Sequence, residues 1–201
     1  MKIAGKWISG IAVVSLAVLL CVTVGLPVVQ GSADHVRWDI ISFTTGPITF
    51  SAGGVAFAAA SNPSTLTIKL RGSGTFIGPA SGRTSSGVTG GGTWETFSGT
   101  TSTGSGTYEV TELVSWQFAN LQTGTVIDNI GDTNKRANGT AVLRIEYSDG
   151  SHGTLGVGCH GFGAPDGIVE GVIATKDFVT YWSAQAPVGG VNANRTVFHI
   201  R

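Results

Sequence analysis

The chain has 201 residues, of which 12 are basic and 12 are acidic, so its formal net charge is zero. Charged residues make up 12 % of the chain, about half the share in an average domain, and its 31 glycines are about twice the usual number. This composition excludes a strongly basic nucleic-acid binder, a charged disordered chain and, because glycine has no three-residue period, collagen.

The first 33 residues have the layout of a secretory signal peptide with a hydrophobic helix. Two lysines precede residues 8–26, which are almost wholly apolar, and Ala33 ends a run of small residues suited to cleavage. The apolar segment is long for a signal and approaches the ~20 residues that span a bilayer. The alternative is therefore an uncleaved anchor that contacts the membrane through residues 8–26. In either case residues 34–201 are expected to be secreted or extracytoplasmic.

Residues 34–201 are predicted to form a single β-rich domain. Apolar and polar side chains alternate through much of this region, and no long stretch has the 3.6-residue period of a helix. The clearest case is 65–71, where Leu66, Ile68 and Leu70 share one face. In chain order the expected strands are 36–43, 48–57, 65–71, 92–97, 108–118, 141–147, 153–159, 168–175, 178–182 and 196–200.

Turn residues separate these strands. Asp149-Gly150 predicts a hairpin, because both residues tolerate positive φ. The triplet 90–92 is interpreted as a turn and 99–106 as a linker, while 128–139 has room for a short helical turn. Ten short strands predict an all-β fold, a single antiparallel β-barrel with a β-sandwich as the alternative. In architecture alone, the pattern resembles small eight-stranded barrels such as lipocalin-like or dirigent-like proteins, which implies no function.

Two glutamates are candidate catalytic groups, because the alternation places both among apolar side chains. Glu112 shares its predicted face with Val110 and Trp116, and Glu170 has a similar setting. A carboxylate in apolar surroundings has a raised pKa and can act as a general acid or base. The alternatives are a bulge that sends the side chains to solvent, or pairing with an arginine such as Arg37 or Arg144.

Cys159 is interpreted as a buried structural thiol, because it alternates with apolar residues. His160 follows it directly, but adjacent strand residues point to opposite faces, so the two side chains should not meet. The four histidines show no metal-ligand spacing. We therefore expect no metal and no other cofactor.

Three aromatic residues, Trp94, Trp116 and Tyr108, are candidate ligand contacts, because such rings stack on sugars and apolar ligands. Core packing is the alternative for each of them. Trp38, Trp116 and Trp182 are expected to fill the interior, whereas Trp94 follows three glycines and is expected to be the most exposed.

The sequence contains no nucleophile elbow, phosphate loop or dinucleotide fingerprint. We therefore expect an exported, non-catalytic β-barrel domain that binds a small apolar or glycan ligand or acts at the cell surface, without nucleic acid. The alternative is a cavity enzyme of isomerase or cyclase type that uses Glu112 or Glu170 as acid or base. A carboxylate that lines a cavity without a paired cation would favour the enzyme.

Overall fold

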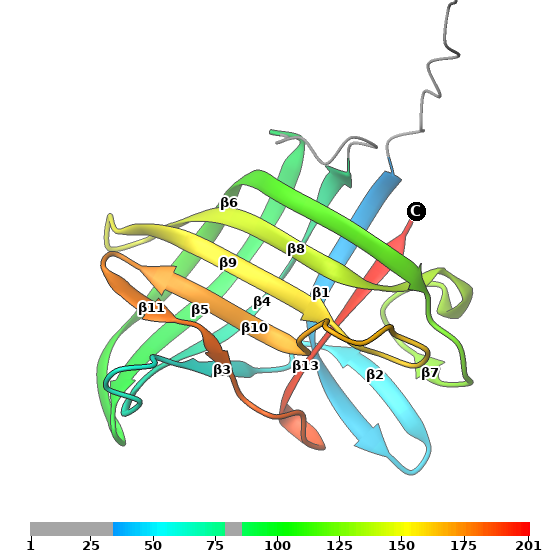
Figure 1. Ribbon diagram of the computed structural model, residues 1–201, viewed down its shortest axis with the longest axis horizontal. Coiled ribbons are helices and arrows are strands. Elements are labelled where there is room, and N and C mark those ends of the chain that lie inside the picture. The colour runs from blue at the N-terminus through cyan, green and yellow to red at the C-terminus, as the bar shows by residue number, and fades with distance from the viewer. Residues whose placement is uncertain (1–33, 79–85) are drawn as a thin grey trace, which may run out of the picture. The chain divides into compact units, whose positions relative to one another are not determined.

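The computed structural model describes residues 34–78 and 86–201, which are nearly all β-strand (Figure 1). The predicted signal peptide, residues 1–33, lies outside the described residues. Within the described ranges, no helix is both long and apolar enough to cross a membrane. One 3₁₀ turn, Thr133–Lys135, lies inside the connection that the sequence indicated for a short helical turn.

The strands of the described residues number thirteen, and each segment expected to be a strand overlaps at least one of them. They are β1 (Asp34–Thr45), β2 (Ile48–Ala52), β3 (Ala56–Ala59), β4 (Leu66–Gly78), β5 (Val88–Ser98), β6 (Thr101–Leu121), β7 (Ile127–Asp128), β8 (Arg136–Tyr147), β9 (His152–Cys159), β10 (Gly171–Lys176), β11 (Val179–Tyr181), β12 (Ser183–Ala184) and β13 (Gly190–Ile200).

All of these strands belong to one hydrogen-bonded sheet, and only the short β2–β7 pair is parallel. The main path runs β11-β10-β9-β8-β6-β5-β4-β1-β2-β7, while β13 pairs with both β1 and β8. Three strands change partner along one edge: β1 passes from β4 to β2, β4 passes from β3 to β1, and β8 passes from β13 to β9. Figure 1 shows β6, β8, β9 and β10 side by side, crossing in front of β1, β4 and β5. The prediction of an all-β, mainly antiparallel fold is confirmed.

The main hydrophobic core lies between these crossing layers. Ile68 and Leu70 of β4 and Leu143 and Ile145 of β8 have no exposed surface, as the alternation predicted. Full burial of each such side chain contributes roughly 1.5–3 kcal/mol. A second, smaller cluster joins β1, β2 and β13 and consists of Ile41, Phe43, Phe50, Val126, Ala193 and Val197.

The Asp149-Gly150 hairpin is confirmed. Gly150 has a φ of 85°, and its N–H donates to the carbonyl of Tyr147 at 2.9 Å, which closes the turn between β8 and β9. The expected strand 48–57 is interrupted where Gly53 has a φ of 81°, and it forms β2 and β3 instead.

The interpretations of 90–92 as a turn and 99–106 as a linker were wrong. The three glycines pair with β4 inside β5, and β6 already begins at Thr101. The reason is long-range packing. A Cβ added at Gly72 would lie 2.1 Å from the Tyr108 hydroxyl, and one at Gly74 would lie 2.8 Å from the indole nitrogen of Trp38. Glycine is needed in this part of β4 and β5 because the backbone of the neighbouring strands and, in β4, large aromatic side chains occupy the space of a Cβ.

The solvent exposure of two tryptophans is the reverse of the prediction. Trp94 is only 5 % exposed, whereas Trp182 is 64 % exposed. Trp94 fits inside because Gly104 and Gly106 of β6 lie beside its ring, and its indole N–H donates to the Thr107 carbonyl at 3.1 Å. Trp182 faces outward because β11 ends with Tyr181 on the inner side. Trp38 and Trp116 are buried as predicted.

Candidate functional site

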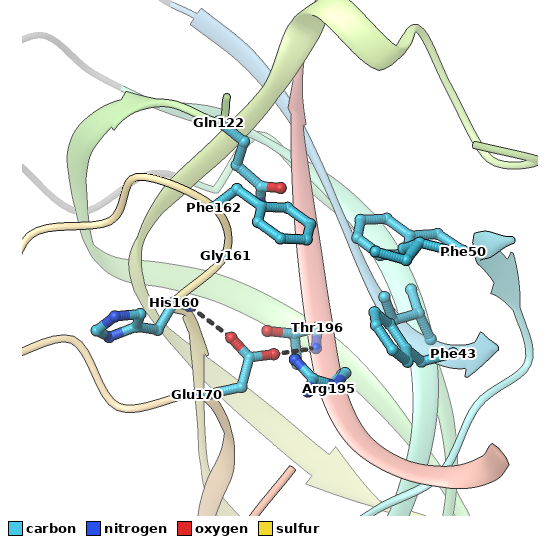
Figure 2. A pocket seen from close by; sticks show the side chains of 11 residues that line it. Phe43, Phe50, Gln122, His160, Gly161, Phe162, Glu170, Arg195 and Thr196 are labelled. Atoms are coloured by element: carbon cyan, nitrogen blue, oxygen red, sulfur yellow. Dashed lines mark hydrogen bonds between the residues drawn. The ribbon is translucent and has the colours of Figure 1, made fainter. Parts of the chain in front are cut away.

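A pocket of about 400 Å³ opens next to the second hydrophobic cluster (Figure 2). Small-molecule sites commonly occupy roughly 300–1,000 Å³. One part of its wall is apolar and comes from Ile41, Phe43, Ile48, Phe50 and Phe162. The other part of the wall is polar apart from one glycine. It comes from the end of β6, the β9–β10 connection and β13. Its residues are Gln122, His160, Gly161, Glu170, Arg195 and Thr196.

Glu170, one of the two glutamates selected from the sequence, lies in this polar part. The backbone N–H of Thr196 donates to its Oε1 at 2.8 Å, and the backbone N–H of His160 donates to its Oε2. Burial raises the pKa of Glu170 to about 7, against the lowering effects of the two amides and of the nearby Arg195 and His160. Ionisation of this carboxyl group is therefore shifted from acidic pH towards neutral pH.

The ring of His160 does not complete an acid–base pair with Glu170. Its Nδ1 lies 2.8 Å from the carbonyl oxygen of Ile168, and the residue is exposed. Figure 2 shows the ring pointing away from the other labelled side chains, while the backbone of His160 reaches Glu170. The site therefore holds one carboxyl group and no neighbouring imidazole positioned to exchange a proton with it.

Arg195 supplies the positive charge of the pocket. Its guanidinium carbon lies 4.3 Å from the ring centroid of Phe43, so the cation rests on the aromatic ring. Its Nε is buried and has no hydrogen-bond partner among the described residues. A buried donor left unpaired costs about 1–3 kcal/mol. Arg195 therefore has an unmet donor beside the pocket, even though Arg195 and Glu170 attract each other electrostatically.

An irregularity in β13 positions Arg195. Asn194 has a φ of 50°, an uncommon value for a residue other than glycine. Its side chain stabilises this backbone, since Oδ1 accepts from the Phe57 N–H at 2.9 Å and Nδ2 donates to the Ala186 carbonyl at 3.1 Å. Strict alternation stops here, because Ala193 and Asn194 are both buried and Arg195 then lines the pocket.

Gln122 connects the pocket to the interior. Its Oε1 accepts from Nη1 of the buried Arg136 at 3.0 Å, and its Nε2 lies 3.1 Å from the sulfur of Cys159. Arg136 also donates to the carbonyls of Gly124 and Thr133. This network fixes one polar side of the pocket, and Arg136 and Gln122 were not among the sequence-based candidates.

Glu112 lies elsewhere, on the outer side of the sheet. Its Oε2 is 3.1 Å from Nε of Arg144, and the two side chains are 31 % and 63 % exposed. Register shifts in β6 at Val110/Glu112 and Leu113/Ser115 reverse the alternation, so the buried positions are 108, 110, 113 and 116. The expected inward orientation of Glu112 was wrong, because the bulge and the arginine pairing, both weighed as alternatives, are present. The structure does not bring Glu112 and Glu170 together.

The three candidate ligand-contacting aromatics are packed in the core. Trp94, Tyr108 and Trp116 are 5 %, 2 % and 7 % exposed, and none of them lines the pocket of Figure 2. Trp116 packs against Phe76 and Phe198, and the Tyr108 hydroxyl donates to the Arg71 carbonyl. The rings that line the pocket are phenylalanines, which the sequence analysis did not select.

The predicted burial of Cys159 is confirmed, since the residue is 1 % exposed, and burial raises the pKa of its thiol. We expect iodoacetamide to modify native Cys159 at least 100-fold more slowly than the urea-unfolded chain, because the reactive thiolate is disfavoured and enclosed. Peptide-resolved mass spectrometry measures this rate separately from Cys21. Equal rates in the native and unfolded protein would contradict the buried position.

Comparisons with protein-family models, curated proteins and solved structures find no match for the chain. The class of the protein therefore follows from its fold and its pocket alone. The protein is an all-β domain with a pocket that combines phenylalanine rings with one arginine and one carboxyl group of raised pKa. Arg195 is the main functional candidate that sequence reasoning missed, because its motif, Asn194-Arg195-Thr196, indicates only a glycosylation sequon.

Proposed function

We propose that this protein is an exported β-barrel domain that binds a small, mainly apolar ligand in the pocket of Figure 2 without transforming it. The observation that carries the proposal is the apolar wall of a 400 Å³ pocket, to which Phe43, Phe50 and Phe162 contribute. Apolar surface facing a pocket of this size is typical of small-molecule sites. A glycan is less well supported, because the tryptophans and tyrosines proposed to stack on sugars are not in the pocket.

Closure of the sheet into a barrel is supported by β13. This strand pairs with β1 along most of its length and with β8 through Phe198↔Ala137 and His199↔Arg136. In a closed sheet β13 would lie between β1 and β8, with the pocket on the side of the β1–β2 hairpin. Export is supported by the leader-like composition of residues 1–33.

The second candidate function is acid–base catalysis by Glu170. The observation in its favour is the pKa of about 7, since a general acid or base works best when its pKa is close to the ambient pH. Binding is favoured over catalysis because the second acid–base group is lacking: the ring of His160 points away, and Glu112 is paired with Arg144 on the outside.

The test uses 1-decanol as an apolar probe with the full-length protein. We expect its addition to shift the backbone amide NMR signals of His160, Gly161 and Thr196. Phe162→Ala should weaken binding by about 1–2 kcal/mol, or roughly 5- to 30-fold, because the ring loses its contact with the probe. Phe162 is 40 % exposed, so the fold should tolerate the change.

The matched control is Phe178→Ala. Phe178 is 94 % exposed and does not line this pocket, so its loss should leave decanol affinity unchanged. Absence of shifts at the three amides, or equal weakening by both alanine variants, would refute binding in this pocket. Conversion of an added small molecule that is lost in Glu170→Gln would instead establish the catalytic alternative.

A further inference from the structure

We infer that the ligand of this pocket carries a carboxylate, which binds to the guanidinium of Arg195. The inference rests on the proposed function and specifies its ligand class: a monocarboxylate with an apolar chain or ring. Two features of the pocket support this ligand class: a guanidinium N–H of Arg195 without an acceptor, and the separation of the charged part of the wall from the apolar part.

Arg195 has N–H groups to which a ligand acceptor could bind. The N–H groups of a guanidinium lie in its plane, so contact with the face of Phe43 leaves them free to donate. The buried Nε of Arg195 has no such partner within residues 34–78 and 86–201. A planar carboxylate can form two parallel N–H···O bonds with an edge of a guanidinium, a stronger arrangement than any neutral acceptor offers.

Glu170 does not already fill this role. Each of its oxygens accepts a backbone N–H, from Thr196 or from His160, and its interaction with Arg195 is electrostatic, without a hydrogen bond. Its raised pKa lets it lose its charge near neutral pH, so it need not repel an anionic ligand. When protonated, its hydroxyl can donate to the ligand carboxylate. Binding is then expected to take up a proton.

The apolar part of the ligand has a place opposite these groups. Figure 2 shows Phe162 and Phe50 facing one another from the two sides of the pocket, with Glu170 and Arg195 lower in the view. Ile48 adds further apolar surface. The pocket thus has a charged part and an apolar part, which is the arrangement that an amphiphilic acid requires.

The first experiment compares decanoate, 1-decanol and decylamine with the full-length protein, by amide shifts of His160 and Thr196. We expect decanoate to bind at least 10-fold more tightly than decanol, and decylamine to bind most weakly, because a charge-assisted contact with Arg195 favours the anion. Arg195→Met should remove the preference for decanoate and retain decanol binding. The control Arg144→Met, on the outer side, should preserve the preference.

The outcomes separate the two proposals. If decanol binds and decanoate binds no better, the carboxylate inference is overturned while the apolar pocket stands. If neither shifts the amides, both proposals fail. Tighter binding of decylamine would assign the pocket to cations and overturn the inference. Since the wild-type comparison decides these cases alone, the result does not depend on whether Arg195→Met folds.

The second experiment follows decanoate affinity from pH 6 to pH 8.5, where the ligand itself stays ionised. The groups that face Glu170 are Arg195 from β13, the Cys159 thiol and His160 from the β9–β10 connection. Affinity should fall as Glu170 ionises, and Glu170→Gln should bind more tightly than wild type at pH 8.5.

The matched control for this arm is Glu112→Gln, which removes a carboxylate outside the pocket and should retain the wild-type pH profile. Affinity that is constant or rises with pH in the wild type would overturn the role of Glu170 as the group that accommodates an anion.

Discussion

Replacing Arg136 by methionine should lower the free energy of unfolding by about 3–5 kcal/mol, because the change breaks a buried charged network. Arg136 is 1 % exposed and donates to the side chain of Gln122 and to the carbonyls of Gly124 and Thr133. Its Nε also lies 4.0 Å from the fully buried carboxylate of Asp128. Methionine fills part of the volume but supplies none of these donors.

The remaining partners of Asp128 do not replace this cation. His199 Nε2 lies 2.9 Å from its Oδ2, and the N–H groups of Ile130 and Gly131 donate to its Oδ1. After the substitution, a buried carboxylate would depend on these partners alone, and three acceptors would lose their donor. The cost therefore comes mainly from groups left unsatisfied, which is the most expensive outcome for a buried polar network.

Urea unfolding followed by circular dichroism measures the effect of Arg136→Met. The control is Arg144→Met, since Arg144 forms an exposed ion pair with Glu112 and such pairs contribute about 0–1 kcal/mol. The Arg136 variant should also bind 1-decanol less tightly, because Gln122 loses the donor that orients it at the pocket. Equal stability of the two variants would show that the network around Arg136 does not hold this end of the sheet.

The alternation of side chains was sufficient to predict the sheet wherever its ladders are regular. Ile68, Leu70, Leu143 and Ile145 face the core because β4 and β8 have no bulge at these positions. In β6 the same reasoning failed for Glu112, because a bulge after Val110 reverses the alternation and a second bulge after Leu113 restores it at Trp116. No local feature of the sequence marks where these bulges lie.

The candidate site was only partly predictable, for a related reason. Glu170 was identified because apolar residues surround it in the sequence, and the structure places it in the pocket. Arg195 was missed because its significance depends on Phe43, which lies far away in the chain and reaches it only through the pairing of β1 with β13. An unmet hydrogen bond is a property of the assembled fold and cannot be recognised from local sequence.

The second large loss of stability is expected from substitution of the glycines that face one another in β4 and β5. Gly92→Ala should destabilise the domain by about 3 kcal/mol or more and lower the Tm by roughly 6–12 °C. A Cβ at this position would lie 1.8 Å from the carbonyl oxygen of Arg71 and 2.7 Å from its carbonyl carbon. These are backbone atoms of the paired strand, so relief of the clash requires the β4–β5 ladder to open.

A comparison with Gly72→Ala and Gly189→Ala tests this explanation by thermal unfolding. At Gly72 the nearest atom is the Tyr108 hydroxyl, so Tyr108→Phe should recover part of the stability that Gly72→Ala loses. No side-chain substitution should rescue Gly92→Ala. At Gly189 a Cβ would meet nothing closer than 3.9 Å, and alanine should be nearly neutral. The close approach of β4 and β5 makes room for Trp38 and Tyr108 in the core. If Gly92→Ala destabilised the domain as little as Gly189→Ala, this description of the β4–β5 contact would be contradicted.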